Sequence, residues 1–324
     1  MLQAENNRKY DIICAGMALV DCIIKGFDPN PVSASGYRAA SCTLNIGGEA
    51  LNEAITASKL GMRTAILCAL GNDEAGEMNF RALANAGVDT GLIRRSEQPT
   101  PVTTMFVRED GGRQSITNSA HRYNFHPERC CSCLADSRAL ILGSLFRAPF
   151  DDPAVIHAVL SSAKAADLLI FADTKLPNFR FLKLEDLHDS LPMIDYITPN
   201  EDEARYYTGK HDPEDMADVF LRHGISHVVI KLGKEGCFYK DAARSMLLPA
   251  CEVQAVDATG AGDNFVAGFA SELLRGSPVA EALHFANACG AICASAVGAC
   301  TALHDRDQVK RFLQAQQQKQ MLSL

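Results

Sequence analysis

The chain has 324 residues, of which 47% are hydrophobic and 22% charged, and its formal net charge is −8 at pH 7. This length allows a substantial buried core, and the negative charge argues against a nucleic-acid groove as the main function. The longest apolar stretches, such as residues 139–145 and 168–172, are too short to span a bilayer, and residues 1–9 are polar rather than signal-like. We therefore expect a cytoplasmic protein with no nucleic-acid or membrane partner.

Twelve cysteines are spread along the chain. Several, such as Cys14 and Cys289, lie in apolar runs, where cysteine behaves as a small hydrophobic residue, so we expect free thiols in a reducing compartment. The one cluster comprises Cys130, Cys131 and Cys133. It lacks the separated second pair that is typical of zinc ligands, which disfavours a metal site there.

Short apolar runs alternate with segments of helical periodicity along most of the chain. The runs predict buried strands at residues 10–15, 64–70, 139–142, 168–172, 196–198 and 227–231. The segments between them predict helices at residues 50–60, 75–86, 153–165, 201–207 and 213–223. This alternation predicts an α/β fold with a mostly parallel sheet, helices on both faces, and a ligand site at the carboxyl ends of the strands.

Two segments, approximately residues 18–45 and 102–118, break the alternation. The first contains short β-prone pieces, and the second reads as two strands around a Gly-Gly turn. We expect them to form a small sheet that covers the strand ends as a lid, although surface hairpins without a role are the simpler alternative. No linker divides the rest of the chain, so residues 1–324 are expected to form a single domain.

The most informative segment is the glycine-rich turn at residues 257–263, Asp-Ala-Thr-Gly-Ala-Gly-Asp, which is followed by an apolar stretch of helical spacing. Small residues let consecutive backbone N–H groups converge on an anion, and the N-terminus of the following helix adds further donors. A carboxylate beside bound phosphate has a natural role as a general base for a hydroxyl nucleophile, and Asp263 is placed for it. The alternative is an ordinary turn with Asp263 as an N-terminal helix acid.

A second glycine pair, Gly47 and Gly48, precedes another predicted helix. The pair permits close approach of a ligand to the backbone, and Asn52 offers a donor and an acceptor to a sugar hydroxyl. Asp21, after the first strand, can accept from two hydroxyls at once. Each signal alone is weak.

Taken together, the motifs resemble those of the ribokinase-like (PfkB) carbohydrate kinases. The chain has GGxxxN at residues 47–52, NxxE at 200–203, KLGKEG at 231–236 and DATGAGD at 257–263, in the order and at the separations of that family. The resemblance covers nearly the whole chain. It implies a three-layer sandwich with a small β-sheet lid, and ATP-dependent phosphorylation of a hydroxyl of a small carbohydrate.

The resemblance also implies roles for individual residues. Asp263 takes the proton from the sugar hydroxyl, and the backbone amides of Gly260, Ala261 and Gly262 form the anion hole for the transferred phosphoryl group. The implied sugar contacts are Asp21, Gly47, Gly48, Asn52 and Asp263.

For ATP, the resemblance implies that Asn200 and Glu203 organise phosphate, water and Mg²⁺, with Glu203 acting through metal-bound water. The remaining nucleotide contacts that it implies are Lys231, Gly233, Gly236, Thr259, Gly260, Gly262 and Asn287. Whether His284 stacks on the base or only packs stays open.

A monovalent cation, K⁺, is implied beside the anion hole. Asp257 and Thr259 match the family pattern, and the other implied ligands are backbone carbonyls of Cys293, Ala296, Gly298 and Ala302. The alternative is that Asp257 simply caps the turn.

Departures from the ribokinase pattern leave the acceptor open. Glu49 and Leu51 stand within a motif that reads GGKGAN in ribokinases, and Ser144 lies where ribokinases place an acidic sugar contact. An anionic sugar could meet basic residues, for which the candidates are Arg108, Arg113 and Lys175. A nucleoside would need an aromatic platform in the lid, where Phe106 is the obvious candidate.

The favoured acceptor is a ribose- or fructose-type monosaccharide. The alternatives are a 2-keto-3-deoxygluconate-like or nucleoside kinase, and a catalytically silent sugar-binding regulator, which the intact Asp263 argues against. No G-x-G-x-x-G set follows the first strand and no G-x-x-x-x-G-K-[ST] occurs, which excludes a dinucleotide oxidoreductase and a P-loop kinase. The lid sheet also predicts a homodimer, because its edge or apolar face can pair with a second copy.

Overall fold

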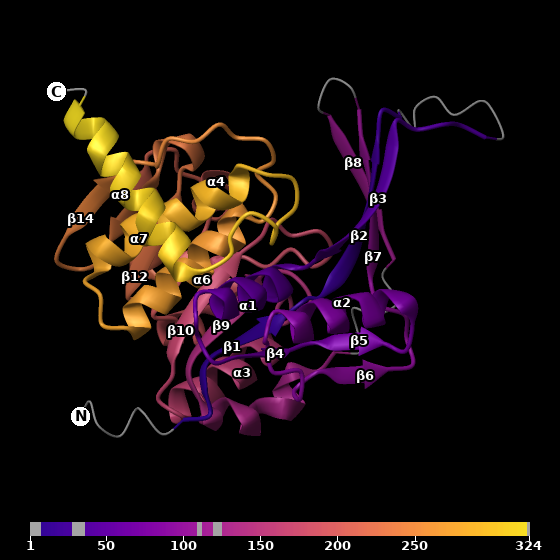
Figure 1. Ribbon diagram of the computed structural model, residues 1–324. Coiled ribbons are helices and arrows are strands. Elements are labelled where there is room, and N and C mark those ends of the chain that lie inside the picture. Colours follow the sequence, from indigo (N-terminus) through magenta and orange to yellow (C-terminus); the bar gives the residue numbers. More distant parts are fainter. Residues whose placement is uncertain (1–7, 28–35, 109–111, 119–124, 323–324) are drawn as a thin grey trace.

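The computed structural model describes residues 8–27, 36–108, 112–118 and 125–322. Its middle layer is an eight-stranded sheet in the order β14-β13-β12-β11-β10-β9-β1-β4 (Figure 1). Neighbouring strands from β4 to β12 pair in parallel, whereas β13 and β14 are antiparallel additions at one edge. The strands are β1 (Tyr10–Gly16), β4 (Thr64–Leu67), β9 (Ser137–Leu145), β10 (Leu169–Thr174), β11 (Tyr196–Thr198), β12 (His227–Lys231), β13 (Cys237–Lys240) and β14 (Ser245–Leu248).

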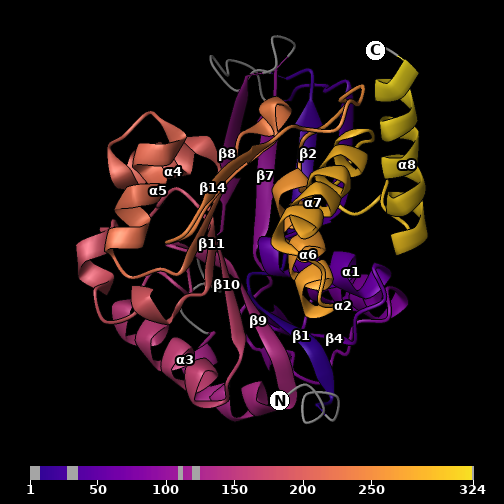
Figure 2. The ribbon, with the colours of Figure 1, turned by 90° about the vertical axis from the view of Figure 1, so that its left-hand side faces the viewer.

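Helices cover both faces of this sheet, so the molecule has three layers (Figure 2). One face carries α1 (Glu49–Lys59), α2 (Glu74–Asn85), α6 (Ala261–Leu274), α7 (Val279–Ala294) and α8 (Arg306–Leu322). The other carries α3 (Pro153–Ala165), α4 (Glu201–Thr208) and α5 (Pro213–Arg222), with the 3₁₀ turns η2 (Pro127–Asp136), η3 (Leu184–Leu187) and η4 (Leu191–Met193). Within the described ranges, every helix is too short or too polar to serve as a membrane span.

The pleat of β1 explains why its sequence is apolar throughout. Ile13 and Ala15 pack into the core on the side of α3 and α5, whereas Ile12 and Cys14 pack into the core on the side of α1 and α6. A strand buried on both faces needs apolar residues at every position rather than at alternate ones. The predicted three-layer α/β fold is therefore confirmed.

The prediction of one strand over residues 64–70 is wrong in its extent. The main-sheet strand β4 ends at Leu67, and the chain then forms β5 (Ala69–Gly71), which pairs in parallel with β6 (Arg94–Ser96) in a separate two-stranded sheet. The Cys68 carbonyl already accepts from the Arg94 amide at 2.9 Å, so the hydrogen-bonding partner changes at this residue. Both pieces are apolar and buried, so the sequence carries no signal for the break.

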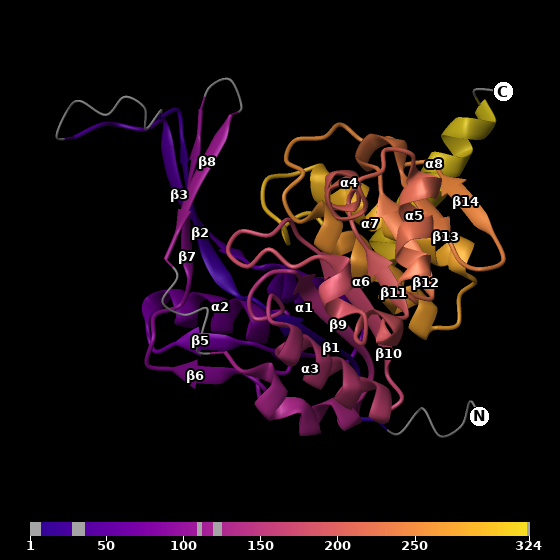
Figure 3. The same ribbon diagram turned by 180° about the vertical axis from the view of Figure 1, so that it is seen from behind.

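The two segments that broke the alternation join into one small sheet, called sheet B here. It contains β2 (Leu19–Lys25), β3 (Ser41–Gly47), β7 (Val102–Val107) and β8 (Arg113–Thr117), in the order β3-β2-β7-β8. Sheet B stands apart from the helical layers, as the view from behind also shows (Figure 3). Residues 28–35 and 109–111 of the expected lid segments lie outside the described residues.

The register of sheet B separates two faces. Leu19, Thr103 and Thr117 are on the face that lines a large cavity. Leu44 and Ile116 point to the opposite face, where their side chains are 61% and 68% exposed.

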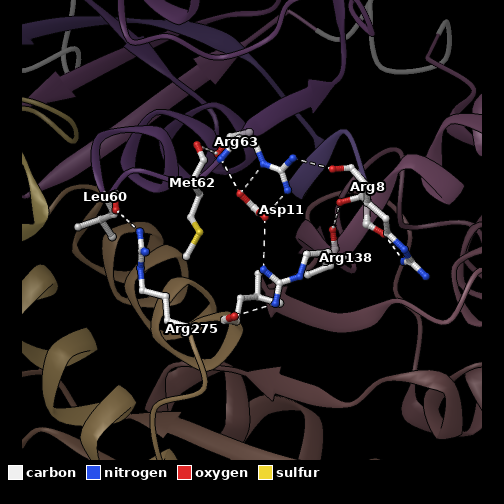
Figure 4. Close-up of polar contacts among 11 residues, drawn as sticks. Arg8, Asp11, Leu60, Met62, Arg63, Arg138 and Arg275 are labelled. Atoms are coloured by element: carbon white, nitrogen blue, oxygen red, sulfur yellow. Dashed lines mark hydrogen bonds and ion pairs between the residues drawn. The ribbon is translucent and has the colours of Figure 1, made fainter. Parts of the chain in front are cut away.

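The start of β1 lies in an arginine network that has a structural role (Figure 4). Asp11 accepts hydrogen bonds from Arg63 at 2.9 Å and from Arg138 at 3.3 Å. The guanidinium groups of Arg8, Arg138 and Arg275 also donate to carbonyls at the C-terminal ends of α3, α6 and α1. Cations are favourable at those negative helix ends, so this network ties three helices to the sheet on the side away from the cavity.

Candidate active site

A cavity of about 900 Å³ lies between sheet B, the N-termini of α1 and α6, and the carboxyl ends of β10 and β12. The face of sheet B that lines it carries Leu19, Thr103 and Thr117. The cavity brings together residues as distant in the chain as Asp21 and Asp263. The predicted site residues that form its walls are Asp21, Gly48, Asn52, Asn200, Glu203, Lys231, Gly233, Thr259, Gly260, Gly262 and Asp263. The sequence motifs therefore predict part of the polar wall, and the rest comes from sheet B, the end of β10 and the loops that follow β9 and β10.

Asp263 is held in the first turn of α6. The chain enters the helix through Gly260, whose φ of 78° is left-handed and whose missing Cβ would collide with Ala299. The Asp263 side chain is only 8% exposed, and its Oδ2 accepts from Asn52 Nδ2 at 2.7 Å. Burial, reinforced by the charge of Glu49, raises the pKa of Asp263 to about 7. A carboxyl group that titrates there can accept a proton near neutral pH.

Asn264 fixes the turn that precedes Asp263. Its Nδ2 donates to the carbonyls of Gly260 and Ala299, both at 2.8 Å, and its Oδ1 accepts from Thr56 at 3.1 Å. Sequence reasoning did not identify this residue, because its role depends on segments that meet only in the fold.

The three amides expected to form an anion hole are not equivalent. The Ala261 N–H donates to the Ala258 carbonyl at 3.2 Å, because the turn closes on itself there. Among the described residues, the amides of Gly260 and Gly262 make no hydrogen bond, and both glycines line the cavity. The turn therefore offers two open amides, and the expected contribution of Ala261 needs this correction.

Asp21 lies on β2 at the opposite wall of the cavity. Gly47 is paired with Leu19 on β2, two residues from Asp21, and a Cβ on Gly47 would collide with the Asp21 carboxylate. Gly47 thus makes room for Asp21 and is not itself a wall residue. Gly48 has a φ of 99° and directs the chain into α1. Burial and the charge of Glu49 raise the pKa of Asp21 to about 6.

The wall near Asp21 also contains residues that the motifs did not reveal. Glu49 Oε1 forms an ion pair with Lys175 Nζ at 2.8 Å, and Arg147 lies close enough to affect the Glu49 charge. Lys175 was one of the basic candidates, whereas sequence reasoning missed the wall residues Arg147, Asn118, Asn178 and Phe179, all in loops. Ser144, in contrast, is buried away from the wall.

In sheet B, the alternation of side chains along β7 decides which of them face the cavity. Met105 is a wall residue, whereas Phe106 points to the opposite face and packs against Phe27 with ring centroids 5.7 Å apart. Arg108 is not among the wall residues. The side chain of Arg113 lies outside the described part of the structure.

The other end of the cavity is built on the N-terminus of α4. Asn200 and Glu203 form a reciprocal capping box, in which each backbone amide donates to the side chain of the other residue at 2.9 Å. Thr174 Oγ1 also donates to Glu203 Oε2 at 2.9 Å, so Oε1 takes part in neither bond. Burial raises the pKa of Glu203. The free oxygen suits a metal-bound water, which fits the Mg²⁺ role expected from the sequence.

Gly236 and Asn287, both expected to contact the nucleotide, are not wall residues of the cavity. Gly236 turns the chain with a φ of 101° between η5 (Gly233–Glu235) and β13. Asn287 is buried and donates to the Pro249 carbonyl at 3.1 Å. His284 lines a separate cavity of about 650 Å³ beside α8, which favours packing over base stacking.

The segments expected to bind K⁺ lie next to the α6 turn. Asp257 Oδ1 accepts from the backbone and hydroxyl of Thr259 at 3.0 and 2.7 Å, and its Oδ2 accepts from the Gly298 amide at 3.2 Å. Cys293 Sγ donates to the Thr259 carbonyl at 3.4 Å, which joins the two segments. These contacts bring Asp257 and Thr259 beside the 293–298 segment, and both Asp257 oxygens and the Thr259 carbonyl already accept hydrogen bonds there. The Ala296 amide donates to the Cys293 carbonyl, and the Ala302 carbonyl accepts from Gln308.

Comparison with known proteins places this site in a family context. The family described as pfkB family carbohydrate kinase matches residues 9–306. The chain is 26% identical over 297 residues to the 2-dehydro-3-deoxygluconokinase of Bacillus subtilis (86% of this chain and 90% of that protein). It is 28% identical over 284 residues to the ribokinase of Haemophilus influenzae (83% and 87%).

Among solved structures, the ribokinase of Arabidopsis thaliana complexed with ribose and ATP has a similar fold. It superposes with a TM-score of 0.83 at 24% identity and covers 94% of this chain and 98% of that chain.

Proposed function

The chain belongs to the pfkB family of carbohydrate kinases, and we propose that it transfers the γ-phosphoryl group of ATP to a hydroxyl of a ribose- or fructose-type monosaccharide. The observation that carries the proposal is the buried Asp263, held by Asn52 in a polar cavity beside two open backbone amides. A sugar bound between Asp21 and Asn52 would present a hydroxyl to Asp263, which removes its proton as the new P–O bond forms.

On the nucleotide side, Asn200 and Glu203 are proposed to hold Mg²⁺-bound water. Lys231, Gly233 and Thr259 are proposed to contact the phosphates of ATP. Mg²⁺ neutralises phosphate charge when it is bound. The amides of Gly260 and Gly262 donate to the migrating phosphoryl group. Gly236 and Asn287 are proposed to hold the backbone near this wall, Gly236 through its turn and Asn287 through its bond to the Pro249 carbonyl. Gly47 makes room for Asp21.

K⁺ activation belongs to the same proposal. A cation held by Asp257, Thr259 and the carbonyls of the 293–302 segment would fix the turn that carries Gly260. Its support is the convergence of Asp257, Thr259, Cys293 and Gly298 on one loop pair.

A sugar acid is the second candidate acceptor. Lys175 and Arg147 both act on the Glu49 charge at the acceptor wall, and either cation can bind a carboxylate of the acceptor. The similarity to a 2-dehydro-3-deoxygluconokinase agrees with this interpretation. A nucleoside is less favoured, because Phe106 points away from the cavity.

The test is ADP release over a panel of neutral pentoses, hexoses, sugar acids and nucleosides, with and without K⁺. We expect neutral monosaccharides to give the highest kcat/KM. Asp263→Asn should lower kcat by about 10²–10⁴-fold while ATP binding, measured by calorimetry, is retained. The proposal is wrong if no acceptor stimulates ADP release, or if the variant turns over sugar at nearly the wild-type rate.

We also propose a homodimer formed through the exposed face of sheet B, and a cytoplasmic location. The dimer is supported by the exposed Leu44 and Ile116 on that face. All twelve cysteines are free, which agrees with a reducing compartment.

A further inference from the structure

Lys231 is the last residue of β12, and its side chain lines the cavity. Its Nζ donates to Asp173 Oδ1 at 2.5 Å, and the two side chains are only 12% and 5% exposed. Asp173 comes from the end of β10 and also accepts from the Thr198 hydroxyl at 3.1 Å. Both partners are thus carried by strand ends, which hold a charged group more rigidly than loops do.

The ammonium group of Lys231 lies directly against the glycine turn. A Cβ built on Gly262 would be 3.2 Å from Lys231 Nζ, so the absence of a side chain at residue 262 lets the cation approach the open amide. The Lys231 backbone amide donates to the Pro199 carbonyl at 2.8 Å, next to the Asn200 and Glu203 capping box. The cation therefore sits between the turn that can bind a phosphoryl group and the residues expected to hold Mg²⁺.

The carboxyl groups of Asp173, Glu203 and Asp263 all favour the charged form of Lys231. Burial alone would lower the pKa of this ammonium group, but the Asp173 carboxylate raises it, so Lys231 stays charged. Glu53 is fully buried and close enough to Lys231 for an electrostatic effect, and neither of its carboxyl oxygens has a hydrogen-bond partner among the described residues. Burial, reinforced by the charges of Asp173 and Asp263, raises the pKa of Glu53 well above its ordinary value. Lys175 is likewise paired, with Glu49 at the acceptor end.

We propose that Lys231 is a catalytic residue whose ammonium group binds the phosphoryl group as it passes from ATP to the sugar, and that Asp173 positions it. The inference rests on the proposed kinase function. In the step, the sugar oxygen forms a bond to the γ-phosphorus, the bond to the β–γ bridging oxygen breaks, and the sugar proton goes to Asp263. Lys231 keeps its proton and offsets the charge on the equatorial oxygens together with the Gly260 and Gly262 amides.

The test compares Lys231→Met, Asp173→Asn and the double variant Lys231→Met/Asp173→Asn with the wild type. Lys231→Met leaves Asp173 as a buried unpaired charge, which could by itself damage the site. The double variant removes both charges and is the matched control for that effect. Thermal unfolding checks that each protein is folded, and calorimetry measures the binding of ADP and of a non-hydrolysable ATP analogue.

We expect kcat to fall by about 10²–10³-fold in both Lys231→Met and the double variant, with the sugar KM and the ADP affinity nearly unchanged. Lys231→Arg should recover part of the rate. The preference for the ATP analogue over ADP should be lost with Lys231. The inference is overturned if the double variant regains wild-type kcat, or if Lys231→Met weakens ADP as much as the analogue. A wild-type protein that shows no turnover would instead refute the proposed function.

Discussion

Asp263 sets the pH at which the site can accept a proton. Its pKa, raised to about 7 by burial and by Glu49, means that the base is protonated below that pH and ionised above it. We therefore predict that kcat/KM for the sugar rises as pH increases through about 7 and levels off above it. Initial rates between about pH 5.5 and 8.5 at saturating MgATP would measure this rise of kcat/KM.

A control separates the titration of Asp263 from that of ATP itself. Glu49→Gln removes the largest charge that raises the pKa of Asp263, and it leaves the Lys175 cation, which lowers that pKa, without its partner. The midpoint of the rise of kcat/KM with pH should then move to lower pH. A profile with the same midpoint in both proteins would assign the titration to another group.

At the residue scale, sequence motifs predicted the side chains that occupy fixed positions on glycine turns and helix ends. Asp263, Asn52 and Glu203 were found in this way, because their chemistry is tied to local backbone geometry. Arg147 and Asn118 could not be found, since they reach the cavity from loops whose position depends on the packing of distant segments. Glu53 gave no signal either, because a glutamate in an amphipathic helix is ordinarily solvated.

At the element scale, the start of α4 couples helix stability to nucleotide binding. Asn200 caps α4 and also fixes the carboxylate of Glu203. We predict that Asn200→Ala lowers the free energy of unfolding by about 1 kcal/mol, as lost N-caps usually do. Because the support of the proposed Mg²⁺-water ligand is lost, the KM for MgATP should rise by about 10-fold.

The matched control for this prediction is Asp212→Ala. Asp212 caps α5 by accepting from the Glu214 amide at 2.9 Å, and it is not a wall residue of the cavity. Urea unfolding should show a similar loss of stability in both variants, while only Asn200→Ala changes the KM. Equal KM values in the two variants would mean that the capping box has a structural role alone.

Element boundaries show where sequence patterns reach their limit. The helix that begins after Asp152 was predicted at its observed bounds, because a proline at its first position and an aspartate cap mark the start. The break between β4 and β5 was not predicted, since a buried strand that changes sheets keeps the same apolar pattern. The β13–β14 hairpin was missed as well, because its two antiparallel edge strands fall outside the alternation of strands and helices that predicted the rest of the sheet.

At the scale of the whole molecule, sheet B has one face over the cavity and one face that is apolar and exposed. Cys22, Leu44 and Ile116 share the outer face, where Leu44 is 61% and Ile116 68% exposed. A sheet that keeps such residues in solvent is expected to bury them against another surface. The same face on a second copy is the simplest partner, because a twofold axis makes one patch complementary to itself.

We predict that the wild-type protein sediments as a dimer and that Leu44→Asp converts it to a monomer, because the new carboxylate would be buried without a partner in the interface. Leu247→Asp is the matched control, since Leu247 is 64% exposed but lies on β14 at the far edge of the main sheet. That variant should remain dimeric. Sedimentation velocity over a wide concentration range measures all three proteins. A monomeric wild type, or a Leu44→Asp protein that is still dimeric, would refute association through sheet B and leave its apolar face to another partner.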